Sequence, residues 1–216
     1  MDLAGLELAA ARWLADLRGR VPARPGLGLD PSRCALLVVD AQRHFLDPAG
    51  RAFLPAAPAV VPRIAELVAA FRHRGSPVLF TRHGHPEGAP GLFGRFYRDY
   101  LRVGEEDWQF LPTLAPLPGE PVIDKASYDA FFGTDLEARL QALGVSQVLL
   151  VGVQTHLCCD TTARAAFCRG LEVHLPVDAL ASKTEDLHLG ALRGLVDGVA
   201  LAHDTKEVLS LCNSTK

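Results

Sequence analysis

Cys34-Ala-Leu-Leu-Val-Val-Asp40 is an unbroken run of six apolar residues that ends in an acid. A second run of the same kind, Gln147-Val-Leu-Leu-Val-Gly-Val153, lies far downstream. Strands that are apolar at every position are buried on both faces, as they are inside a parallel sheet covered by helices. These two segments therefore predict strands of a parallel sheet, with Asp40 at the carboxyl end of the first.

Segments with helical spacing alternate with further short apolar runs around these two strands. The additional expected strands are residues 77–82, 121–125, 171–177 and 198–202. The expected helices are residues 60–74, 91–103, 134–143 with Thr134 as the N-cap, 158–169 and 185–196. Because such alternation builds βαβ units, the predicted fold class is α/β: a three-layer α/β/α, doubly wound domain with about six mostly parallel strands.

The first residues of the chain predict a separate helix. Leu3, Leu6, Trp13 and Leu17 recur at helical spacing, and the helix is expected to end at Pro22-Ala-Arg-Pro-Gly26. We therefore expect a helical extension over residues 1–28, packed on its own domain or on a neighbouring subunit, and a single domain over residues 29–216.

Composition excludes several classes of protein. The net charge of −3 offers no basic excess for nucleic acid. The apolar run Cys34–Val39 is far shorter than the roughly 20 residues that span a membrane. Acidic residues near the start argue against a secretory signal. The odd number of cysteines, five, predicts reduced thiols and a cytoplasmic location.

Reactive side chains follow the predicted strands at the edge where ligands bind in such sheets. Asp40 ends the first strand, Arg82 and His83 end the second, and Lys125 ends the third. The turn from Gly152 to Cys158 follows the fourth strand. Taken singly, Asp40 is more often an ordinary cap or loop acid, Lys125 is usually a surface lysine and Cys158 is usually a small buried residue. Together they place an acid, a base and a thiol where they could converge.

Gly152-Val-Gln-Thr-His-Leu-Cys158 resembles the nucleophile turn of the isochorismatase-like hydrolases, or cysteine hydrolases, which include nicotinamidases and N-carbamoylsarcosine amidases. The resemblance covers residues 34 to 209. Further matching motifs are Val38-Val-Asp-Ala-Gln42 with Phe45, Asp124-Lys125 with Tyr128, Ala130, Phe131 and Gly133-Thr-Asp-Leu136, Thr161-Thr-Ala-Arg164 with Ala166, and Val177-Asp-Ala179.

The resemblance implies an Asp40, Lys125 and Cys158 catalytic triad. A cysteine at a helix N-terminus beside a lysine is expected to have a lowered pKa. Asp40 would take the thiol proton and return it to a leaving amine, and water would resolve the thioester. The family also implies a cis peptide bond at Val153–Gln154, which would direct the backbone N–H groups of Gln154 and Cys158 at an oxyanion.

The pocket around this triad is expected to use side chains from the neighbouring segments. The candidates are Phe45, His83, His85, Trp108, Tyr128 and Phe131, of which the aromatic ones are equally candidates for the core or a subunit interface. Nicotinamidases of the family hold a divalent metal with an acid and histidines on this connection. Here the acid position is Thr81 and no third ligand is evident, so we expect neither a metal nor another cofactor.

The family contains two chemistries. Amidases need the cysteine, whereas some isochorismatases hydrolyse a vinyl ether with the aspartate as acid and no thiol. Cys158 favours hydrolysis of a C–N bond in a small amide or imide. Isochorismate hydrolysis is the alternative, although the carboxylate-binding arginine region reads Gly88-Ala-Pro-Gly91, leaving Arg82 or Arg95 as substitutes. A non-catalytic assembly or binding protein is a third hypothesis.

The expected partners are a small-molecule substrate and further copies of this chain, in a homodimer or homotetramer with residues 92–101 near the interface.

Overall fold

The described residues form a seven-stranded parallel sheet. The computed structural model describes residues 2–97 and 99–214. The strands are β1 (Cys34–Val39), β2 (Val78–His83), β3 (Val122–Lys125), β4 (Gln147–Val153), β5 (Glu172–Pro176), β6 (Leu180–Ala181) and β7 (Ala200–His203). Their order is β3-β2-β1-β4-β5-β7, with β6 also paired to β4. The predicted α/β fold class is confirmed, and the strand beyond the expected six is the two-residue β6.

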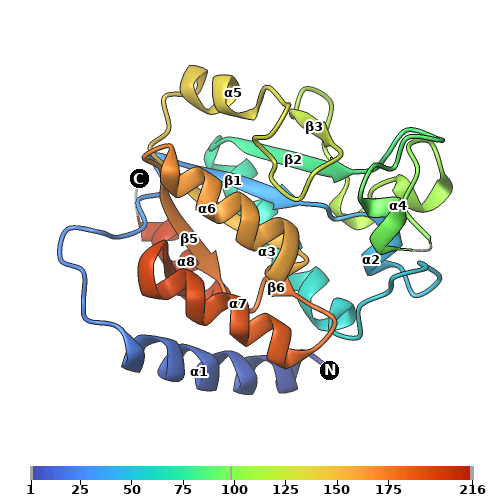
Figure 1. The fold of residues 1–216 in the computed structure, drawn as a ribbon. Helices are drawn as coiled ribbons and strands as arrows, with labels where there is room; N and C mark the ends of the chain where they lie inside the picture. The colour runs from blue at the N-terminus through green and yellow to red at the C-terminus, as the bar shows by residue number, and fades with distance from the viewer. Residues whose placement is uncertain (1, 98, 215–216) are drawn as a thin grey trace.

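Helices cover both faces of the sheet and produce three layers. In Figure 1, α6 and α7 lie in front of the sheet and α3 and α8 lie behind it. The helices are α1 (Leu3–Arg20), α2 (Arg43–Leu46), α3 (Ala57–Arg74), α4 (Phe93–Phe96), α5 (Leu136–Ala142), α6 (Asp160–Cys168), α7 (Glu185–Gly198) and α8 (Thr205–Ser214). Within the described ranges, none is both long and apolar enough to cross a bilayer.

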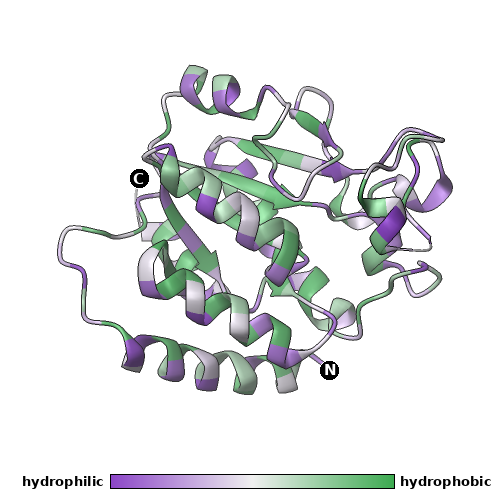
Figure 2. Ribbon diagram, viewed as in Figure 1, coloured by the Kyte–Doolittle hydropathy of each residue, from purple (hydrophilic) through white to green (hydrophobic). Residues whose placement is uncertain are grey.

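The direction of winding reverses between β1 and β4. From β1 the chain adds β2 and β3 on one side, and from β4 it adds β5 and β7 on the other. The carboxyl ends of β1 and β4 therefore flank the topological switch point, where doubly wound sheets bind ligands. Apolar colour follows β1 in Figure 2, and β1 and β4 are buried along their whole lengths.

Gly152 allows β1 and β4 to approach closely at this point. Its φ is +114°, and a Cβ built there would lie 2.1 Å from the carbonyl oxygen of Val39. Only glycine accepts both the backbone conformation and the contact. The end of β4 is consequently held tightly against the end of β1.

The N-terminal helix α1 belongs to the same hydrophobic core as the sheet. Leu6 and Leu17 are fully buried in that core. Trp13 is also buried, and its indole N–H donates to the Glu185 carboxylate on α7 at 2.7 Å. Figure 1 shows α1 running along the bottom of the molecule beside α7. The helix thus packs on the domain of its own chain.

The structure corrects two expectations about helices and adds α8, which was not expected. Within residues 91–97 and 99–103, only the single turn α4 is helical, because the segment contains two glycines, Gly91 and Gly94, and the Phe93 ring packs on His85 and Tyr128. The N-cap of α5 is Asp135, while the Thr134 hydroxyl donates back to the carbonyl of Ala130 at 2.6 Å. Helix α8, which the sequence analysis did not include, packs against α3.

Candidate active site

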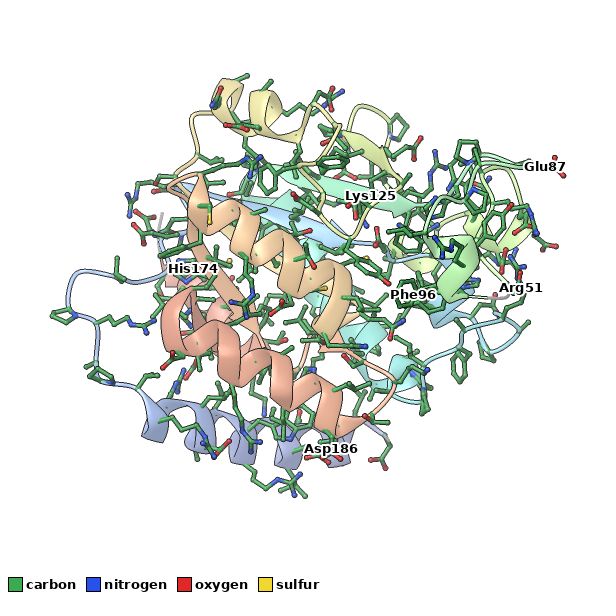
Figure 3. The ribbon with its side chains drawn as sticks, in the orientation of Figure 1. Arg51, Glu87, Phe96, Lys125, His174 and Asp186 are labelled. Carbon is green, nitrogen blue, oxygen red and sulfur yellow. The ribbon has the colours of Figure 1, made fainter. Side chains whose placement is uncertain are left out.

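The three reactive side chains meet at the carboxyl edge of the sheet. Asp40 follows β1, Lys125 ends β3, and Cys158 lies in the short π-helical turn η3 (Thr155–Cys159) after β4. The Lys125 Nζ is 2.8 Å from Asp40 Oδ2 and 3.3 Å from Cys158 Sγ. The side chains of Asp40 and Lys125 are both 0% exposed. Figure 3 labels Lys125 among the side chains at this end of the sheet.

Neighbouring groups fix the orientation of the acid and the base. The Thr81 hydroxyl on β2 donates to Asp40 Oδ1 at 2.6 Å. The Lys125 ammonium also donates to the Ser127 carbonyl at 3.0 Å. Asp40 has a φ of +49°, a left-handed conformation that Asp and Asn tolerate better than most other residues. The acid is therefore pre-oriented toward the lysine by its backbone as well as by its partners.

Burial and the ion pair together set the charge state of these groups. Burial is the largest single influence and would raise the pKa of Asp40, but the charge of Lys125 and the hydrogen bonds from Lys125 and Cys158 together lower it. Burial alone would lower the pKa of Lys125, but the neighbouring Asp40 carboxylate raises it. The resting site thus holds a carboxylate and an ammonium in the low-dielectric interior, where their attraction is strong.

The thiol departs from the expectation of a lowered pKa. Burial is the main cause that raises the pKa of Cys158, and the Asp40 carboxylate raises it further, while Lys125 lowers it only in part. A thiolate here would add a second negative charge beside one buried lysine. In the resting site Cys158 is consequently a neutral thiol that hydrogen-bonds the Asp40 carboxylate.

A largely apolar cavity of about 140 Å³ opens beside the thiol. Cys158, Gln154 and Leu157 form one wall, and residues of α2 and the loops after β2 form the other. The complete lining is His44, Phe45, Ala52, His83, Phe93, Tyr97, Asp99, Tyr100, Leu101, Tyr128, Gln154, Leu157 and Cys158. Its size suits a small molecule, and aromatic rings dominate its surface.

Three of the pocket candidates named from sequence line this cavity: Phe45, His83 and Tyr128. The other three lie outside its lining. His85 is buried behind His83, with the two ring centroids 5.0 Å apart. The Trp108 ring lies under the Arg82 guanidinium, with 3.4 Å from the ring centroid to Cζ, and the Phe131 ring lies under Arg169, with 4.6 Å between the same points.

Several lining residues come from segments that the sequence analysis did not connect with the pocket. Phe93 of α4 packs on both His85 and Tyr128, with ring centroids 4.4 Å and 4.9 Å apart. The hydroxyls of Tyr97 and Tyr128 are 2.7 Å apart. The aromatic spacing of residues 93–100 was the available signal, but it was interpreted as a helix. His44 was not singled out because its position four residues after Asp40 has no helical or strand pattern to orient it.

The loops that carry these residues are fixed by polar contacts. The Gln42 side chain donates to the carbonyls of His83 and Trp108 and accepts from the His83 N–H, at 2.8 to 2.9 Å. Arg51 forms ion pairs with Asp99, Asp107 and Glu105. In Figure 3, Arg51 lies among the loops on the right of the view, on the side of α4. Arg51 thus joins three points of the loop of residues 99–107, which contributes Asp99, Tyr100 and Leu101 to the cavity wall.

The residues present do not fit a metal site on the histidine connection. Thr81, at the position of the expected acid, donates its hydroxyl proton to Asp40. His83 Nδ1 and His85 Nε2 are buried without hydrogen-bond partners among the described residues, so two imidazoles are available, but zinc sites in proteins use three or four protein ligands. Asp40, His83 and Cys158 do place ligand atoms within 4.8 Å of one another, yet the Lys125 ammonium contacts two of the three.

Burial also keeps His83 uncharged. It is the main cause that lowers the pKa of His83 to about 3, and the nearby Lys125 ammonium acts in the same direction. His83 is therefore a neutral imidazole at ordinary pH. It contributes hydrogen-bonding capacity to the cavity and no charge.

Comparison with known proteins identifies the family. Residues 34–207 match the family model described as the isochorismatase domain. Nicotinamidase 3 of Arabidopsis thaliana is 33% identical, over 79% of this chain and 84% of the relative. The phenazine biosynthesis protein PhzD of Pseudomonas fluorescens is 31% identical, over 84% of this chain and 87% of the relative.

A solved structure agrees with this assignment. The cysteine hydrolase of Pseudomonas syringae pv. phaseolicola superposes with a TM-score of 0.83 and 26% identity, covering 89% of this chain and 99% of that one. The fold, the matched domain and these relatives together show that the chain belongs to the isochorismatase-like hydrolase family.

Proposed function

We propose that this chain is a cysteine hydrolase that cleaves a C–N amide or imide bond of a small molecule through a thioester on Cys158. The observation that carries the proposal is the position of Cys158, which lines an apolar cavity while hydrogen-bonding Asp40 and Lys125. Vinyl-ether hydrolysis has no use for a thiol in that position. The similarity to a nicotinamidase supports the same chemistry.

The charge balance of the buried triad explains how a neutral thiol can react. Asp40, Lys125 and the thiol together carry no net charge in the resting site. Transfer of the thiol proton to Asp40 leaves a thiolate paired with the Lys125 ammonium, and the net charge is again zero. Formation of the nucleophile therefore adds no unpaired charge to the low-dielectric interior and avoids the desolvation cost of such a charge. Deprotonation occurs as the thiol attacks, not before it.

The reaction then follows from these positions. The Cys158 sulfur forms a bond to the substrate carbonyl carbon, and Asp40 holds the proton that the thiol released. The C–N bond breaks as Asp40 returns this proton to the leaving nitrogen. A water molecule next loses its proton to Asp40 and attacks the thioester. The released sulfur recovers that proton as the acid product leaves.

The oxyanion of each tetrahedral intermediate needs hydrogen-bond donors. We assign them to the backbone N–H groups of Gln154 and Cys158. Both residues line the cavity, so their amides lie next to the position where the substrate carbonyl would meet the sulfur. Donors of this kind typically contribute 10²- to 10³-fold to turnover.

Isochorismate hydrolysis is the second candidate, because PhzD is among the relatives. An isochorismatase would bind carboxylates, yet the described residues that line the cavity include no arginine or lysine. Arg82 is engaged by Asp124 at 2.7 Å and by Trp108, and Arg95 is exposed on α4. These contacts favour an uncharged substrate over one with carboxylates.

Assays of three variants against both substrate classes distinguish these chemistries. Cys158→Ala should remove hydrolysis of small amides almost entirely, because no other group can form the thioester. Cys168→Ala, at an exposed cysteine, is the matched control and should keep full activity. Asp40→Asn should abolish both chemistries. If Cys158→Ala retains full activity toward the best substrate, whether amide or isochorismate, the nucleophile assignment is wrong.

We also propose that the enzyme is a cytoplasmic homodimer or homotetramer with residues 92–101 at or near the interface. In support, Leu92 is 64% exposed and Phe96 is 79% exposed on the segment that covers the cavity. Burial of such side chains between copies would remove apolar surface from water. Light scattering at micromolar concentration tests this, and a clean 23.2 kDa monomer would contradict it.

A further inference from the structure

His44 occupies a position in the cavity wall that the proposed reaction does not use. It belongs to α2, is 8% exposed, and lines the same cavity as Cys158. Its Nδ1 lies 2.8 Å from Asp107 Oδ2. This buried imidazole, backed by a carboxylate, is one of the polar groups in a largely apolar wall.

The hydrogen bond to Asp107 fixes which ring nitrogen of His44 faces the carboxylate as a donor. Burial alone would raise the pKa of Asp107, but hydrogen bonds from Arg51 and His44 lower it. Asp107 is therefore ionised and can only accept, so the His44 Nδ1 carries the proton. In the neutral imidazole the other nitrogen, Nε2, is then a hydrogen-bond acceptor.

The orientation of this acceptor is held by a second layer of contacts. Arg51 donates to Asp107 Oδ2 at 2.8 Å and to Oδ1 at 3.1 Å. The Phe45 ring packs edge-on against His44, with centroids 4.7 Å apart. A carboxylate partner that is itself fixed in place holds a histidine in one orientation.

Most other polar groups in the described part of the wall are already paired. Tyr97 and Tyr128 bond each other, and Asp99 pairs with Arg51. The groups left without donors are Gln154 Oε1 and His83 Nδ1, which are buried and unpartnered among the described residues, and His44 Nε2. A cavity lined with unpaired acceptors is complementary to a ligand that brings N–H or O–H donors.

We propose that His44, positioned by Asp107, is a specificity-determining residue that accepts a hydrogen bond from an N–H or O–H substituent of the substrate. The inference rests on the amidase function proposed above and adds the substrate class to it. The preferred substrates are small uncharged amides that carry a second hydrogen-bond donor away from the scissile amide. Amides with an apolar group of equal size at that point are disfavoured.

Binding to the Cys158→Ala variant tests this without turnover. The probes are 3- and 4-hydroxybenzamide, each compared by calorimetry with the methylbenzamide of the same substitution pattern. At least one hydroxy compound should bind about tenfold more tightly than its methyl partner, as expected for one buried hydrogen bond. Adding His44→Phe should abolish this preference, whereas His44→Gln, which keeps a polar group near the Nε2 position, should retain part of it.

Controls separate a structural effect from a specific one. His73→Phe, at an exposed histidine on α3, should leave the preference unchanged, and thermal unfolding should show that each variant is folded. A preference that survives His44→Phe, equal affinity of both compounds in each pair, or no binding of any of the four would overturn the assignment. Because no turnover is measured, these results are independent of whether Cys158 forms a thioester.

Discussion

Replacement of Lys125 by methionine should destabilise the protein far more than loss of an ordinary lysine. Methionine keeps the length of the side chain and removes its charge. The Asp40 carboxylate would then be fully buried 2.8 Å from the position of the lost ammonium, with no cation in contact. Breaking a buried pair in this way typically costs about 3–5 kcal/mol, because the remaining charge has neither water nor a partner.

The size of the attraction supports that figure. At an effective dielectric constant of about 20, two unit charges 2.8 Å apart attract by about 6 kcal/mol, which sets an upper scale for the loss. Asp40→Asn should cost a similar amount, because it leaves Lys125 unpaired, and asparagine accepts the left-handed backbone at this position. The double variant should cost about 3 kcal/mol less than the sum of the two single changes.

Urea unfolding at pH 7 measures these differences. Lys206→Met, at a lysine whose side chain is 68% exposed, is the matched control and should change the free energy of unfolding by less than about 0.5 kcal/mol. If Lys125→Met costs no more than this control, or if the double variant equals the sum of the single variants, the buried pair does not behave as argued here.

The stability difference between the native protein and Lys125→Met should depend on pH. In the native protein the pKa of Asp40 is lowered from 3.8, so its stabilising contribution is present above pH 3.8 and is lost as pH falls through the folded value. The raised pKa of Lys125 makes its contribution full below 10.5 and lost as pH rises further. Without Lys125, burial should raise the pKa of Asp40, so the stability difference between Lys125→Met and the native protein should shrink as pH falls toward 4.

Three further outcomes are expected. Iodoacetamide at mildly acidic pH should label the exposed Cys168 before Cys158, because burial raises the pKa of the Cys158 thiol. Peptide mass mapping measures the order of labelling, and labelling of Cys158 first would contradict this expectation. Gly152→Ala should prevent stable folding, because its Cβ would meet a carbonyl oxygen at 2.1 Å, whereas Gly190→Ala, which meets nothing within 4 Å, should leave the melting temperature unchanged or higher. Leu17→Ala should lower the free energy of unfolding by about 2–5 kcal/mol if α1 is part of the core, and a loss below about 1 kcal/mol would contradict that packing.

The sequence was most informative where one physical requirement dominated. The run from Cys34 to Val39 is apolar at every position because both of its faces are buried, and its strand was predicted within one residue. Asp40, Lys125 and Cys158 could be placed on one edge because parallel strands end on the same side of a sheet. Their mutual contact follows from that topology together with the family resemblance.

The cavity wall was harder to anticipate because its geometry depends on contacts distant in sequence. The rings of residues 93–100 have a helical spacing, but Phe93 gains more from packing on His85 and Tyr128 than a helix with two nearby glycines could offer. The charge state of Cys158 was also misjudged. The helix N-terminus and Lys125 suggested a lowered pKa, but the desolvation of the fully buried thiol and the Asp40 carboxylate beside it raise the pKa of Cys158.

Arg51 gives the loop of residues 99–107, which it joins to the segment after α2, a dependence on ionic strength. Its partner Asp99 has a side chain that is 53% exposed, whereas the side chain of its partner Asp107 is 19% exposed. Dissolved ions screen exposed pairs more strongly than sheltered ones. Added salt should therefore loosen the loop at Asp99 first and ease the exchange of small molecules, while His44 keeps its orientation against Asp107. One guanidinium would thus let the rate of ligand entry change without altering which ligand is selected.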